Sequence, residues 1–168
     1  MSRNIAANIV IALCLILCQV LICNHIMLFN VAMAFIFIYV IVALPIDLKA
    51  DWLLTIAFFC GLIVDVFSNT PGVNSLSCTL LAIMKQPVFY AYVPRDDRTK
   101  SISPSLRDLG FGVYGKYLLT MSAIYCVLAF TIEYFNFADV KEIVIMSAAS
   151  ALLTFLVLLG LDSLIVKK

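Results

Sequence analysis

Hydrophobic residues fall into six runs along this chain, and short polar breaks separate them. Each run approaches the roughly 20 residues of helix needed to cross a bilayer core of about 30 Å. The period-two alternation of a membrane β-barrel is absent from the sequence, so each run is predicted to be a transmembrane helix. The predicted spans cover residues 5–23, 27–44, 52–67, 73–92, 114–135 and 143–166.

Composition supports this interpretation. Hydrophobic residues make up 64% of the chain, charged residues make up 12%, and the mean hydropathy is +1.12. These values lie far from those of a soluble globular domain. We therefore expect an all-α integral membrane protein, with residues 1–168 forming one six-helix transmembrane domain.

The basic residues predict the orientation. Six spans put both termini on one side of the membrane, and every basic residue except Lys141 then lies on that side. These residues are Arg3, Lys49, Lys85, Arg95, Arg98, Lys100, Arg107, Lys116, Lys167 and Lys168. By the positive-inside rule the termini are cytoplasmic and the turn at residues 68–72 faces outward.

One carboxylate, Asp65, interrupts the third apolar run. An ionisable group at the centre of a membrane costs about 2.5–3.5 kcal/mol on insertion scales and is rarely left facing lipid. Thirteen residues separate Trp52 from Asp65, which is about 20 Å of helix, so Asp65 is predicted in the outer third of the membrane. Ser68 and Asn69 are candidate hydrogen-bond donors to it, and a simpler interpretation is that Asp65 only caps the turn.

Small and polar residues recur at helical spacing on several predicted helices. Such stripes are typical of closely packed membrane helices. They comprise Gly61, Asp65 and Ser68; Ser75, Cys78 and Ala82; Asn8, Ala12, Leu15 and Gln19; Ser122, Cys126, Ala129 and Glu133; and Ser147, Ala151, Thr154, Leu158 and Asp162. Helix packing explains these stripes, and an alternative is that Gln19, Asp65 and Glu133 line a cavity.

Recognisable catalytic chemistry is missing from the sequence. The single histidine, His25, falls in a short break between apolar runs, and no H-E-x-x-H, G-x-S-x-G or phosphate-binding loop is present. The six cysteines lie in apolar runs without a C-x-x-C pair. We expect no enzyme activity, catalytic residue, cofactor or metal site, and no nucleic-acid partner.

The central hairpin also carries a motif. Gly61, Leu62, Asp65 and Ser68, followed by Pro71, Gly72, Asn74 and Leu76, resemble the pattern G-L-x-x-D-x-x-S, P-x-G, N-x-L of the bacterial rod shape-determining protein MreD family. Here Pro71 precedes Gly72 directly, whereas the family commonly has one residue between them. The chain length, the six predicted spans and the polar loop after the fourth span are also similar to that family.

The resemblance implies a non-enzymatic scaffold subunit of the cell-elongation (rod) complex, located in the bacterial inner membrane. Such a subunit lies among membrane lipids, binds an MreC-like protein, and acts through it on an MreB-like filament and a peptidoglycan glycosyltransferase and transpeptidase pair. Its implied role is to support cell shape and cell-wall synthesis. The family fold is similar to the six-helix substrate-binding subunits of energy-coupling-factor transporters, so the alternative function is a small-molecule-binding membrane subunit of a transporter.

Overall fold

The computed structural model describes residues 2–23, 32–93, 104–134 and 140–166. These residues form six α-helices and no β-strand, which confirms the predicted all-α class. The helices are α1 (Ser2–Cys18), α2 (Tyr39–Ala43), α3 (Ala50–Ser68), α4 (Val73–Tyr92), α5 (Leu106–Glu133) and α6 (Val140–Val166). A π-helical segment (Gln19–Cys23) extends α1, and a 3-10 turn (Ile36–Ile38) precedes α2.

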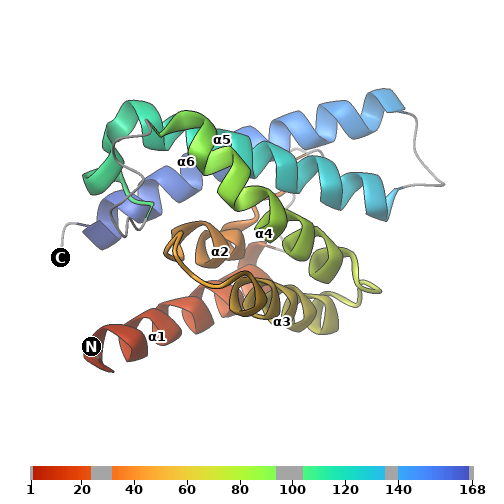
Figure 1. Ribbon diagram of the computed structural model, residues 1–168. Coiled ribbons are helices and arrows are strands. Elements are labelled where there is room, and N and C mark those ends of the chain that lie inside the picture. The colour runs from red at the N-terminus through yellow and green to blue at the C-terminus, as the bar shows by residue number, and fades with distance from the viewer. Residues whose placement is uncertain (1, 24–31, 94–103, 135–139, 167–168) are drawn as a thin grey trace.

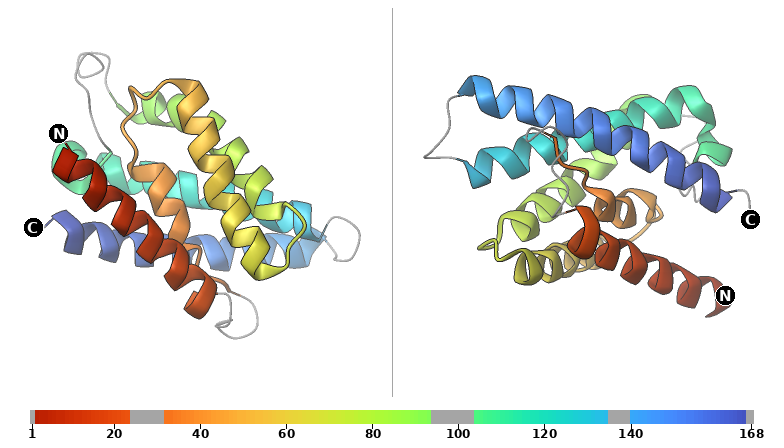
Figure 2. Two further views of the ribbon diagram at one scale, coloured as in Figure 1. Left: turned by 90° about the horizontal axis from the view of Figure 1, so that it is seen from below. Right: turned by 180° about the vertical axis from the view of Figure 1, so that it is seen from behind.

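The helices form two layers with α2 and α4 between them (Figures 1 and 2). The hairpin of α5 and α6 is one layer, and α1 and α3 form the other. Helix α4 packs against both α3 and α5, while the core side chains of α2 are fully buried. The α3–α4 turn lies at the same end of the molecule as the end of α5 and the start of α6. The start of α1 and the end of α6 lie at the opposite end.

Within the described part of the chain, three helices are long and apolar enough to cross a membrane. They cover Ala50–Ser68, Leu109–Glu133 and Val140–Ser163, close to the third, fifth and sixth predicted spans. Helix α5 starts before residue 114, where its span was predicted, and Gly110 interrupts it with a left-handed φ of 72°. Helix α4 matches its predicted bounds, but its mean hydropathy is lowered by polar residues that face the interior, Asn74, Ser75, Ser77 and Lys85.

The second predicted span, residues 27–44, is wrong as a continuous helix. Residues 32–35 are non-helical, and only residues 36–43 form the 3-10 turn and α2, while residues 27–31 lie outside the described part of the chain. Eight helical residues provide about 12 Å of length, far less than a bilayer core. The prediction from apolar composition alone therefore overestimated the length of this helix.

The physical reason for the break is a set of side-chain hydrogen bonds to the backbone of the non-helical segment. The Gln19 amide donates to the carbonyl of Ala34 over 3.1 Å and accepts from the amide of Ile36 over 2.7 Å. Two hydroxyl groups of α6 also accept, Ser150 from Met33 N (3.0 Å) and Thr154 from Phe35 N (3.1 Å). Non-helical backbone inside a membrane protein persists only where partners of this kind satisfy it.

Lys85 is also placed differently from the prediction, which counted it with the cytoplasmic basic residues. Its side chain is 0% exposed. The ammonium donates to the carbonyls of Ile41 (2.9 Å) and Leu44 (2.5 Å), at the C-terminal end of α2. Helix C-termini present unpaired carbonyls and a partial negative charge, which a cation neutralises. Lys85 therefore fixes α2 against α4 and adds nothing to the surface charge.

Candidate functional site

The hairpin between α3 and α4 reverses through two residues in the left-handed conformation. Asn69 has φ 55° and ends α3, where its amide bonds to the carbonyl of Asp65. Gly72 has φ 80° and occupies the N-cap position of α4. A glycine has no side chain with which to cap a helix, so the first turn of α4 needs acceptors from elsewhere.

Asp65 supplies those acceptors from the neighbouring helix. Its Oδ1 accepts from Thr70 Oγ1 (2.7 Å), Asn74 N (2.9 Å) and Asn74 Nδ2 (3.0 Å). Its Oδ2 accepts from Ser75 N (2.8 Å) and from the Ser75 hydroxyl. The residue is only 3% exposed. A negative charge at a helix N-terminus is also favoured by the helix dipole.

The enclosure of Asp65 was predicted correctly, and its donors were predicted in part. Turn donors such as Ser68 and Asn69 were expected; the turn residue that donates to the carboxylate is Thr70, and Asn74 and Ser75 of α4 donate as well. The reversal at the two left-handed residues turns the first turn of α4 back over the carboxylate. The missing side chain at Gly72 is the sequence signal that a cap from another element is required.

Gly61 allows the two helices to approach closely enough for this capping. A Cβ atom added there would lie 2.5 Å from the Asn74 carbonyl oxygen and 2.6 Å from Ser75 Cα. Both atoms belong to backbone, which cannot move aside as a flexible side chain can. The small residues Ser75, Cys78 and Ala82 of α4 are buried, as their predicted stripe requires.

A buried tyrosine extends the network to a third helix. Tyr125 of α5 donates its hydroxyl to Asn74 Oδ1 over 2.6 Å. The ring of Tyr125 also contacts Phe35 edge-on, with centroids 5.1 Å apart. Sequence reasoning missed Tyr125, because an isolated tyrosine in an apolar run gives no sign of its partner. The Asp65 hairpin is thereby linked to α5 and to the non-helical segment.

The motif residues divide into a buried and an exposed set. Gly61 is buried with Asp65 and Asn74, and Ser68 is partly buried. Pro71 and Gly72 are exposed, and Leu76 is 49% exposed. The buried set fixes the hairpin from inside, and the exposed set forms its outer surface.

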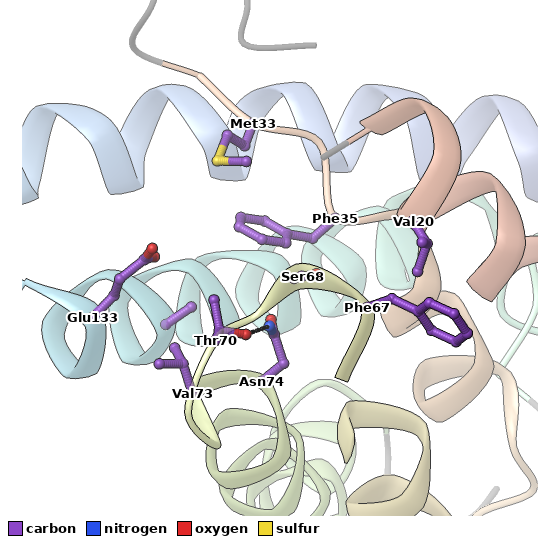
Figure 3. A pocket seen from close by; sticks show the side chains of 10 residues that line it. Val20, Met33, Phe35, Phe67, Ser68, Thr70, Val73, Asn74 and Glu133 are labelled. Atoms are coloured by element: carbon purple, nitrogen blue, oxygen red, sulfur yellow. Dashed lines mark hydrogen bonds between the residues drawn. The ribbon is translucent and has the colours of Figure 1, made fainter. Parts of the chain in front are cut away.

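A cavity of about 330 Å³ lies beside the hairpin (Figure 3). Its lining comes from the α1 extension, the non-helical segment, the α3–α4 hairpin and α5. The lining residues are Val20, Met33, Phe35, Phe67, Ser68, Thr70, Val73, Asn74, Ala129 and Glu133.

Of the three predicted cavity residues, only Glu133 belongs to the lining. Gln19 and Asp65 lie one layer behind it. Gln19 bonds to the backbone on either side of Phe35, and Asp65 bonds to Thr70 and Asn74. Gln19 and Asp65 therefore position residues of the cavity lining by hydrogen bonds and do not line the cavity themselves.

Searches of protein-family models, curated proteins and solved structures give no match to this chain. Among the described residues, no three His, Cys, Asp or Glu side chains come together as a group that could hold a metal ion. The functional interpretation consequently depends on the hairpin and the cavity.

Proposed function

We propose that this chain is a six-span protein of the bacterial inner membrane with cytoplasmic termini. Three helices of sufficient length and hydropathy support a membrane location. The common end of the molecule at which α1 starts and α6 finishes supports an even number of crossings. In this proposal the second crossing is a broken span, made of the non-helical segment and α2.

Within that membrane its proposed function is that of a non-enzymatic scaffold subunit of the cell-elongation complex. The carrying observation is the saturation of Asp65 by donors of its own chain, which leaves the carboxylate a structural role. The result is a fixed hairpin whose outer surface is free for a partner. Val66 of α3 is exposed by 71% and belongs to the same hairpin as Leu76 of α4. A membrane helix of an MreC-like partner is the proposed occupant, with the filament and the peptidoglycan synthases recruited indirectly.

Co-purification with the MreC-like partner tests this function. The double variant Val66→Ala with Leu76→Ala removes exposed side chains and leaves the Asp65 network intact. We expect about a tenfold loss of partner affinity, the size associated with removing one or two important interface side chains. The matched control is Leu152→Ala with Leu156→Ala, which truncates equally exposed residues of α6.

Asp65→Ala gives a second readout, because loss of the cap displaces the whole hairpin. We expect it to weaken partner retention as well. Retention equal to that of the control for both the Asp65 variant and the surface double variant would remove the hairpin from the interface and refute the scaffold role assigned to it.

The cavity favours a second candidate function, that of a small-molecule-binding subunit of a transporter. Its volume of about 330 Å³ falls at the lower end of the range of ligand sites, about 300–1,000 Å³. Native mass spectrometry of the purified protein tests it. A retained small molecule is the expected result, and a spectrum of the protein alone counts against this candidate.

A further inference from the structure

The cavity beside the hairpin has an acidic side and an apolar side. Glu133 of α5 stands on one side, and Phe67 and Val20 stand on the other (Figure 3). Thr70 and Asn74 lie between them. Within the described part of the chain, the Glu133 carboxylate forms no hydrogen bond or ion pair. Glu133 is the one charged residue of the lining. Because its carboxylate has no partner there, it is available to a ligand.

The neutral polar groups between these two sides are already engaged. Thr70 Oγ1 donates to Asp65 and accepts from Asn74 Nδ2 over 3.2 Å. Asn74 uses its amide group on Asp65 and Thr70 and its carbonyl oxygen on Tyr125. A ligand would gain little from these groups, because their hydrogen bonds are spent within the protein. Selection for charge consequently depends on Glu133.

We propose that the cavity binds a small organic ammonium compound with an apolar body. A carboxylate forms charge-assisted hydrogen bonds with an ammonium group, which places the charged end of the ligand at Glu133. The rings of Phe35 and Phe67 and the side chains of Val20 and Met33 accommodate the apolar body. The cavity size limits the ligand to a small molecule or to the head of a larger one.

The same chemistry has two sources, a free amine or the ammonium headgroup of a phospholipid. This proposal rests on the second candidate function, the small-molecule site, and is independent of the scaffold role. Its test therefore separates the existence of the site from its preference for an ammonium group.

Three probes separate charge from shape: 2-phenylethylamine, 2-phenylethanol and 3-phenylpropionate. They share a ring on a short chain and carry a positive, neutral or negative end. Binding is measured by titration calorimetry on protein in nanodiscs made only of phosphatidylglycerol, which has no ammonium headgroup. Heats from empty nanodiscs of the same lipid are subtracted, because this anionic lipid itself attracts the amine and repels the carboxylate. We expect the amine to bind most tightly and the carboxylate least.

Glu133→Gln keeps the shape of the side chain and removes its charge. We expect it to weaken amine binding about fivefold, as for a partly exposed ion pair, and to leave binding of the alcohol unchanged. The matched control is Glu142→Gln, an exposed acid of α6 outside the cavity lining, which should change neither affinity.

Nanodiscs that also contain phosphatidylethanolamine distinguish the two sources. Weaker amine binding in these discs identifies the lipid headgroup as the natural occupant, and unchanged binding identifies a free amine. Equal affinities of amine and alcohol in both the wild type and Glu133→Gln would overturn the ammonium preference while keeping the site. Absence of binding by all three probes would overturn the site and the second candidate function together.

Discussion

Replacement of Asp65 by asparagine separates the charge of this side chain from its shape. The amide has one oxygen where the carboxylate has two, and a donor in place of the other. Whichever way the amide is oriented, its NH₂ group faces a backbone N–H of the first turn of α4, either that of Asn74 or that of Ser75. At least one buried N–H then loses its acceptor, which costs about 1–3 kcal/mol.

Loss of the negative charge at the α4 N-terminus adds about 0.3–1 kcal/mol. The expected total is a decrease of about 1–4 kcal/mol in the free energy of unfolding. Removing the charge of a buried carboxylate also removes the free-energy cost of its desolvation. In the wild type, five hydrogen bonds to Asp65 already compensate that cost, so we expect the substitution to lower stability.

Unfolding by sodium dodecyl sulfate in mixed micelles measures this change. Trp52, the single tryptophan, lies on the same helix as Asp65 and reports through its fluorescence. The matched control is Asp47→Asn, which changes an exposed carboxylate in the turn between α2 and α3. If Asp65→Asn unfolds with the free energy of the control, the carboxylate does not hold the hairpin and the assignment of Asp65 as its cap is wrong.

Gly61→Ala should lower the free energy of unfolding by about 1–3 kcal/mol, because the added methyl group would clash with the backbone of α4. The control is Gly160→Ala, where a Cβ atom meets nothing within 4 Å, so the free energy of unfolding should stay unchanged or rise slightly. Equal effects of the two substitutions would refute the close approach of α3 to α4 at Gly61. Thr154→Val should lower the free energy of unfolding by about 1–3 kcal/mol and speed hydrogen exchange of the Phe35 amide, which donates to the Thr154 hydroxyl. Unchanged exchange would contradict the clamp on the non-helical segment, by which we mean the hydrogen bonds that it forms with Gln19, Ser150 and Thr154. A water-soluble amine-acylating reagent should label exposed Lys116 and spare buried Lys85 in native micelles, and equal labelling would place Lys85 at the surface after all.

Local pattern was sufficient to predict the α3–α4 hairpin. The run from residue 73 to 92 matches α4, and the turn residues match the reversal at Asn69 and Gly72. The inward stripe that ends at Asp162 on α6 is buried as predicted. Helical periodicity succeeds in these regions because neighbouring helices bury the faces that the pattern marks.

The broken second span could not be predicted, because the groups that stabilise it come from distant parts of the chain. Met33 and Phe35 are apolar, and their residue types do not mark a break. Gln19, Ser150 and Thr154 provide the hydrogen bonds across separations of 15 to 119 residues. Lys85 was misplaced for a similar reason, since its carbonyl partners lie more than 40 residues away.

The clamp on the non-helical segment has a consequence for biogenesis. The amides of Met33 and Phe35 pair with hydroxyl groups that the ribosome adds more than 100 residues later. While the nascent chain is shorter than that, this stretch of polypeptide lacks its final partners and must remain near water, the insertion machinery or a temporary helix. Maturation therefore finishes with the arrival of the last helix, and a truncated product without it would be left to membrane quality control.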